Sequence, residues 1–180
     1  MRTATSLLLA ISLLPPALSA QETAVAGPVI FSAGAVFPIP TPDFATPPDL
    51  DYRLAFEVGQ GSPSPDQLNV GFNSVARFLN MHAQAGVPRE RVRAAVVVHG
   101  TAGWEILEDD AYRERFGVAN PNSELIEELL DFGVQVILCG QTAASRGIPH
   151  ESRIEGVQVA LSAMTAFVVL QEQGYRVNPW

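Results

Sequence analysis

Apolar and polar residues alternate or cluster along residues 51–180 in a way that predicts strands and helices in turn. Residues 52–58 alternate with period two and stop at Gly59, as a half-buried strand does. Residues 92–99 hold five consecutive apolar residues without alternation, which is typical of a strand buried on both faces of a parallel sheet. Further strands are predicted over 134–138, 157–161 and, at an edge, 175–177.

Helices are predicted between these strands. The first runs from Pro65 to Ala85, because apolar residues recur along it at steps of three and four. The others are expected over 104–116, 121–132, 142–146 and 162–173, several of them ending at a glycine. Strands and helices in alternation predict a three-layer α/β/α fold with an open, mainly parallel sheet of about five strands.

The first fifty residues do not follow this alternation. Arg2, the apolar run 7–14 and the small residues before Ala20 predict a signal peptide over 1–20, and so a periplasmic or secreted protein. That run is far shorter than the roughly 20 residues that span a bilayer, so no membrane anchoring is expected after cleavage. Residues 21–50 contain six prolines and indicate an extended arm. The arm is either a spacer or, as its apolar residues favour, a segment packed on its own domain or on a neighbouring subunit. The α/β domain is assigned to residues 51–180.

Charge and cysteine content exclude several classes of protein. The 180 residues include 11 basic side chains, all arginine, against 19 acidic ones, for a formal net charge of −8. A chain of this charge lacks the basic face that nucleic acid or an anionic membrane surface would require. One cysteine and three histidines leave no disulfide framework and no cysteine-rich zinc site, and no metal or other cofactor is expected.

Two strands are predicted to end in chemically capable residues, at the edge where open α/β sheets place their sites. His99 and Gly100 end the second strand, and Cys139 and Gly140 end the third. A helix beginning at Thr142 would direct free N–H groups at Cys139 and stabilise its thiolate, the form that attacks sulfane sulfur. The alternative is a small buried cysteine without a chemical role.

The segment 138–148, Leu-Cys-Gly-Gln-Thr-Ala-Ala-Ser-Arg-Gly-Ile, resembles the region around the sulfur-carrying cysteine of the DsrE/DsrF-like, or sulfur-relay, family. The shared elements are Leu-Cys, an alanine in the helix that follows, and Arg-Gly seven and eight residues after the cysteine. They fall on Leu138, Cys139, Ala143, Arg146 and Gly147. The resemblance covers about residues 54–177 and is to extracytoplasmic members.

This resemblance implies a periplasmic sulfur carrier with sulfurtransferase-like activity, in which Cys139 holds sulfur as a persulfide. It also implies a homotrimer or homohexamer that exchanges sulfur with donor and acceptor proteins. Some relatives have a second cysteine where this chain has Thr142, so a resolving thiol would have to come from another molecule.

Further residues join Cys139 in the candidate site. His99 is expected to hydrogen-bond the thiolate or a bound anion, or else only to satisfy the turn at Gly100. Arg146 is expected to hold an anionic sulfur donor, or else only to complement the end of its helix. Gly140 would let a donor approach the backbone, and Thr142 would offer its hydroxyl to the thiolate.

Two other interpretations complete the expectations. The function alternative to a carrier is a non-catalytic oligomeric module that binds a small ligand or partner, with a structural Cys139. The acidic cluster of Glu105, Glu108, Asp109 and Asp110 is expected to form a solvated helix face rather than a metal site.

Overall fold

The computed structural model describes residues 23–178 and contains a five-stranded sheet in which every neighbouring pair is parallel. The predicted signal peptide, residues 1–20, lies outside the described residues. The strand order is β4-β3-β2-β1-β5. The strands are β1 (Tyr52–Val58), β2 (Val92–Val98), β3 (Gln135–Cys139), β4 (Gln158–Ala160) and β5 (Arg176–Val177).

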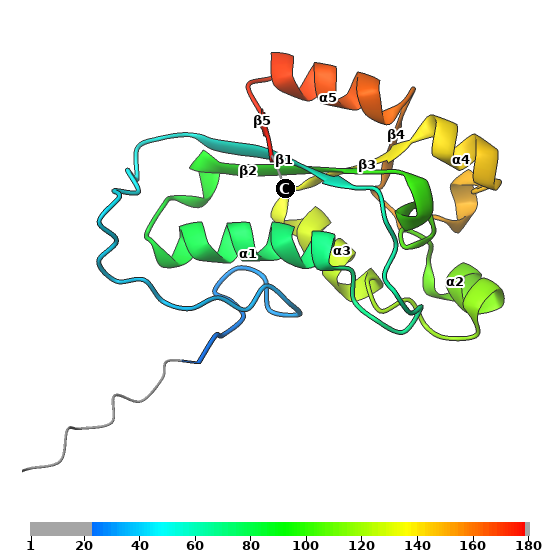
Figure 1. The fold of residues 1–180 in the computed structure, drawn as a ribbon, viewed down its shortest axis with the longest axis horizontal. Coiled ribbons are helices and arrows are strands. Elements are labelled where there is room, and N and C mark those ends of the chain that lie inside the picture. The colour runs from blue at the N-terminus through cyan, green and yellow to red at the C-terminus, as the bar shows by residue number, and fades with distance from the viewer. Residues whose placement is uncertain (1–22, 179–180) are drawn as a thin grey trace, which may run out of the picture.

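Helices cover both faces of this sheet (Figure 1). α1 (Val70–Gln84) and α3 (Ser123–Phe132) lie on one face, and α5 (Ala163–Glu172) lies on the other. The three-layer α/β/α prediction is therefore confirmed. The remaining helices are α2 (Asp109–Phe116), α4 (Gly140–Arg146) and the short 3-10 turns η1 (Arg89–Arg91), η2 (Gly100–Trp104) and η3 (His150–Ser152).

The strand order explains why α5 has a face of the sheet to itself. The chain steps in one direction from β1 to β4 and then returns across the sheet to place β5 beside β1. Because crossovers between parallel strands are right-handed, the helix of the returning connection lies on the opposite face.

β2 supplies side chains to both sides of the sheet. Ala94, Val96 and Val98 belong to the larger core beneath α1 and α3, whereas Ala95 and Val97 face α5. All five are almost fully buried. The apolar run of this strand does not alternate because both of its faces are covered.

Three predicted helix boundaries were wrong. α1 begins at Val70 rather than Pro65, because Asn69 caps it and accepts a hydrogen bond from the Gly71 N–H at 2.7 Å. The helix predicted over 104–116 is divided into η2 and α2 by residues 105–108. α4 begins at Gly140 rather than Thr142.

Part of the Pro-rich arm is bonded to the α/β domain. The buried Asn80 on α1 accepts the N–H groups of Val29 and Ile30 at 3.2 and 2.9 Å, and donates to the carbonyls of Ile30 and Gly34. Glu128 on α3 accepts the N–H groups of the next two residues, 31 and 32. Ile30 is completely buried as a result.

Among residues 23–178, no helix combines the length and the apolar character that a membrane span requires.

Candidate functional site

Cys139 is both the last residue of β3 and the residue that caps α4. It pairs with Ala160, the last residue of β4, so the ends of two neighbouring strands meet at the thiol. The cysteine is free and only 6% exposed. The predicted nucleophile therefore lies at the carboxyl edge of the sheet, with little of its surface open to solvent.

Hydrogen-bond donors from two helices converge on the Cys139 sulfur. Burial alone would raise the pKa of the thiol, but the N–H groups of Thr142, Ala163 and Gln141 and the Thr142 hydroxyl outweigh it. The pKa of Cys139 is consequently lowered from its ordinary value. Gln141 and Thr142 lie in the first turn of α4, whereas Ala163 is the first residue of α5. The sulfur thus lies where a thiolate is stabilised.

The site residues predicted from the sequence did not include Ala163, whose N–H helps to lower the pKa of Cys139. The helix predicted over 162–173 is α5, and Ser162 caps it, because its hydroxyl oxygen accepts the Thr165 N–H at 3.0 Å. Ala163 could have been found by considering the start of α5 together with the parallel order of the strands. Since β3 and β4 end at the same edge, the first turn of α5 is brought to the cysteine that ends β3.

Thr142 is held on both sides of its branched side chain. Its hydroxyl oxygen accepts the Gly100 N–H at 3.1 Å. Its methyl group lies over Gly103, where an added Cβ would be only 2.6 Å away. The side chain is buried and has one orientation that satisfies both contacts. Two predicted site residues, Gly100 and Thr142, are therefore in direct contact.

The two site glycines are required by close backbone approaches. Gly100 has a φ of +56°, and a Cβ there would collide with the carbonyl oxygen of Gly59. A Cβ on Gly140 would lie 2.6 Å from the carbonyl oxygen of Ala160 at the end of β4. Gly140 therefore allows β4 to pass beside the start of α4, which differs from its predicted role in admitting a donor.

His99 forms its hydrogen bond on the other side of β2. Its Nε2 atom lies 2.8 Å from Oε1 of Glu57 on β1, and its ring lies over Gly59. β1 and β3 flank β2 on opposite sides. His99 and Glu57 line a cavity of about 660 Å³, which Asn69 and Ser74 also border. The hydrogen bond seen for His99 thus goes to a carboxylate rather than to the thiol.

Arg146 lies at the carboxyl end of α4, whereas Cys139 caps the amino end of the same helix. Its guanidinium carbon is 5.9 Å from the centre of the Trp104 ring. The structure thus joins Cys139 with Gly140, Thr142 and Gly100 and places Arg146 against a different group.

The expectation of a solvated acidic face is wrong for Glu105. This carboxylate is 4% exposed and accepts hydrogen bonds from the Ser62 N–H at 2.6 Å and from Asn69 Nδ2 at 2.5 Å. Burial raises the pKa of Glu105 in spite of these donors. The role of Glu105 is structural, because it ties the loop that follows β1 to the cap of α1. Among the described residues no group of three or more metal-ligating side chains is found.

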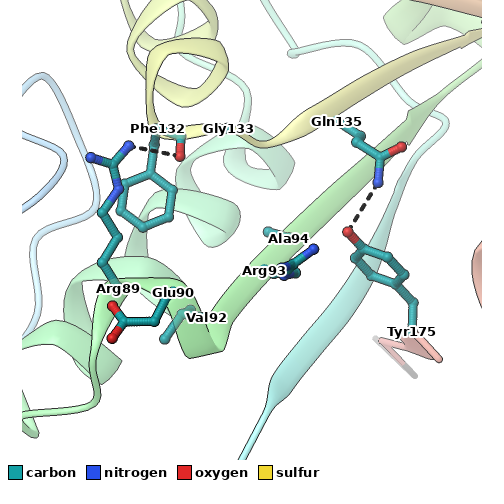
Figure 2. Close-up of a pocket in the computed structure, with 9 residues that line it drawn as sticks. All are labelled: Arg89, Glu90, Val92, Arg93, Ala94, Phe132, Gly133, Gln135 and Tyr175. Atoms are coloured by element: carbon teal, nitrogen blue, oxygen red, sulfur yellow. Dashed lines mark hydrogen bonds between the residues drawn. The ribbon is translucent and has the colours of Figure 1, made fainter. Parts of the chain in front are cut away.

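Another cavity, of about 390 Å³, opens at the opposite edge of the sheet, where β2 and β3 begin (Figure 2). Arg89 lies over the Phe132 ring and donates to the Phe132 carbonyl at 3.0 Å. Across the cavity, Gln135 donates to the Tyr175 hydroxyl at 3.0 Å. These polar groups bond one another at the amino ends of the strands, so this cavity is not the candidate site.

Comparisons with known proteins give one family match and a likeness of fold. The sequence model of the DsrE/DsrF-like family matches residues 55–179. The solved structure of a protein of unknown function from Methanobacterium thermoautotrophicum is similar, with a TM-score of 0.50 and 23% identity, over 71% of this chain and 98% of that one. At this identity the likeness concerns the fold alone. No curated protein matches the chain.

Proposed function

Because the chain belongs to the DsrE/DsrF-like family, we propose that it is a periplasmic sulfur carrier with sulfurtransferase-like activity, in which Cys139 holds sulfur as a persulfide. The observation that carries this proposal is the convergence of donors from α4 and α5 on the Cys139 sulfur. These donors favour a thiolate before the reaction and would also stabilise the negative terminal sulfur of a persulfide.

The chemistry takes two exchange steps. The Cys139 thiolate attacks the outer sulfur of a persulfide or thiosulfate-like donor. With thiosulfate, the sulfur–sulfur bond of the donor breaks and sulfite leaves with its electron pair, while a new bond joins Cys139 to the transferred sulfur. An acceptor thiolate then attacks that terminal sulfur, and the Cys139 thiolate leaves. The acceptor belongs to another molecule, because Cys139 is the chain's one cysteine.

The burial of the cysteine limits which donors fit. With 6% of Cys139 exposed, the sulfur that reaches it has to be the terminal atom of a narrow donor. A persulfide or thiosulfate presents such an atom. A donor protein would therefore deliver sulfur at the end of an extended side chain or segment.

Sulfur labelling tests the proposal directly. The protein is incubated with thiosulfate labelled in its outer sulfur, or with a small persulfide, and the label bound to each chain is measured after gel filtration. We expect up to one labelled sulfur per chain, and none on Cys139→Ser with the same circular dichroism spectrum. Equal labelling of the two proteins, or none of either, would exclude the carrier.

The burial of Cys139 is also the observation that favours the alternative function. A buried cysteine is what a non-catalytic binding module with a structural thiol would have. Alkylation by iodoacetamide across a range of pH separates the two functions. A carrier reacts in the folded state with a pKa below that of a free thiol, whereas a structural cysteine stays unreacted until denaturant is added.

We also propose that the protein is a homo-oligomer, a trimer or hexamer. Supporting this, large apolar side chains are exposed on and around α5, which we call the α5 surface: Leu161, Met164, Val168, Val169 and Val159. Met164 is the most exposed of them, at 77%, and a contiguous exposed apolar patch of this kind is typical of a surface that another protein covers. Because α5 also donates to Cys139, a second subunit on this surface would border the site.

Export is part of the proposal as well, and it depends on the signal peptide predicted over residues 1–20. N-terminal sequencing of the mature protein tests it. We expect a start near Gln21 and recovery from the periplasm or the medium. A protein that keeps Met1 in the cytoplasm would contradict export without affecting the sulfur chemistry.

A further inference from the structure

Two guanidinium groups approach one indole ring at the far end of α4 from Cys139. The guanidinium carbon of Arg115 on α2 lies 3.4 Å from the centre of the Trp104 ring. That of Arg146 on α4 lies 5.9 Å from the same centre. Residues from α2, η2 and α4 therefore bring two positive charges to one aromatic ring.

Neither charge is balanced within residues 23–178. No side-chain hydrogen bond or ion pair joins the guanidinium group of Arg115 or of Arg146 to any described residue. Arg113, two residues before Arg115, instead pairs with Asp109 and Asp110 on its own helix. In a chain with eight more acidic than basic side chains, two arginines on one ring that form no ion pair are unusual.

A cavity of about 550 Å³ lies beside this ring. Trp104, Arg115, Phe116, Ile148 and Ser152 line it, and so does Gly147, the residue after Arg146. Its size suits a small ligand, and its walls combine aromatic faces with a cation. One acidic side chain, Glu114, also lines it and would oppose an anion there.

We propose that Arg115 binds a small oxyanion, either free or as the end group of a larger molecule, in the cavity beside Trp104. Arg146 does not line this cavity, but it approaches the same ring and supplies a second positive charge beside it. A guanidinium that lies over an aromatic ring uses its face for that contact and keeps its N–H edge for acceptors. The edge of Arg115 matches the oxygens of a phosphate, sulfate or thiosulfate. The Trp104 ring holds Arg115 in place, and the anion offsets the positive charge of both arginines.

This site is separate from the sulfur chemistry proposed for Cys139. Arg146 and Cys139 lie at opposite ends of α4, so an anion on the Arg146 side of this helix is not in line with the thiol. Oxyanion binding is therefore expected to be unchanged in Cys139→Ser, and failure of either proposal leaves the other standing.

Tryptophan fluorescence provides the test, because the chain has only Trp104 and Trp180. A Trp180→Phe background leaves Trp104 as the single reporter. The protein is titrated with sodium phosphate, sulfate or thiosulfate at constant ionic strength, with sodium chloride as the balancing salt. The oxyanion at the guanidinium groups is expected to change the emission of Trp104 in a saturable way.

Substitutions then assign the response to the two arginines. We expect Arg115→Gln to weaken binding by about tenfold or more, since it removes charge-assisted hydrogen bonds. Arg146→Gln removes only a nearby charge and should weaken binding by less. Arg146→Lys keeps that charge, so its affinity for the anion should be close to that of the parent. Glu114→Gln should strengthen binding. Arg89→Gln, which removes an arginine from the Phe132 ring instead, is the matched control and should bind like the parent.

Two results would overturn the proposal. The first is the absence of saturation with all three oxyanions, or a response that sodium chloride reproduces. The second is binding by Arg115→Gln as tight as by the parent. A comparison of affinities separates a free ion from an end group on a larger ligand. If a phosphorylated or sulfated small molecule binds more tightly than an inorganic anion of the same charge, the natural ligand is the larger molecule. If it does not, the ligand is the free ion.

Discussion

The hydroxyl oxygen of Thr142 lies 3.1 Å from the backbone nitrogen of Gly100 and accepts its hydrogen bond. The hydroxyl proton is therefore directed away from Gly100, and this hydroxyl is one of the groups that lower the pKa of the Cys139 thiol. The turn that ends β2 thus orients a group that polarises the thiol at the end of β3.

Replacement of Thr142 by valine should raise the pKa of the Cys139 thiol, because it removes the hydroxyl donor while keeping the shape of the side chain. Valine also leaves the partly buried Gly100 N–H without its acceptor, which should cost about 1 kcal/mol in the free energy of unfolding. The pH dependence of the iodoacetamide reaction measures the first effect, and urea denaturation measures the second.

Thr142→Ser is the matched control for that experiment. It keeps the hydroxyl and loses only the methyl group that lies over Gly103. Serine should restore the pH profile of the parent even if the protein becomes slightly less stable. If Thr142→Val reacts with the same profile as the parent, the hydroxyl has no part in the state of the thiol.

Alanine at Gly100 should destabilise the fold more than alanine at Gly117. Both glycines have positive φ, +56° and +77°, so each substitution carries a backbone strain of roughly 1–2 kcal/mol. A Cβ on Gly100 also meets the Gly59 carbonyl, whereas a Cβ on Gly117 has nothing within 4 Å. Urea denaturation of the two variants isolates the effect of the contact, and equal losses of stability would show that strain alone matters.

The fold could be predicted from the sequence because each strand and helix has its own local pattern. The unbroken apolar run of β2 already indicates a strand with both faces covered. The period of β1 indicates its main core face, whereas Ala55 on the other face is also buried, in the core under α5. The start of α1 was missed because Pro65 is an equally good first residue of a helix. Asn69 is selected instead by a long-range contact, its hydrogen bond to the buried Glu105.

The sequence predicted which residues stand at the ends of neighbouring strands, but not which partners their side chains contact. Cys139, Gly100 and Thr142 follow from strand ends that meet at one edge. The pairing of His99 with Glu57 depends on which neighbour the ring turns toward, and both β1 and β3 offered partners. The contact of Arg146 with Trp104 could not be predicted, because it depends on the course of residues 99–108, part of which the sequence assigned to a helix.

A charge placed on the α5 surface should separate the proposed oligomer into smaller units. Met164→Asp would put a carboxylate where the neighbouring subunit is expected, and a buried unpaired charge should raise the dissociation constant by about a hundredfold or more. Multi-angle light scattering at micromolar concentration measures the mass. Gln67→Asp adds the same charge at an exposed position outside α5 and should leave the mass unchanged. A parent protein that is monomeric under these conditions would contradict the oligomer.

The bond between the arm and Glu128 should make part of the stability depend on pH. Glu128 accepts the N–H of Phe31 at 2.7 Å and both the N–H and the hydroxyl of Ser32, at 3.0 and 2.6 Å. Partial burial would raise the pKa of this carboxyl, but the three donors outweigh it, and the pKa is lowered from 4.5.

A carboxyl with a lower pKa in the folded than in the unfolded chain stabilises the fold when it is ionised in both states. The stabilisation by Glu128 is therefore fully present above pH 4.5 and is lost as the pH falls through the lowered value. Urea denaturation of the parent and of Glu128→Gln at several pH values between 3 and 7 should show a difference in unfolding free energy that is largest near neutrality and shrinks below pH 4.5. Glu127→Gln, an exposed neighbour on α3, is the control for the loss of a charge from that helix. If Glu128→Gln lowers stability by the same amount at every pH, the arm does not depend on the charge of this carboxylate.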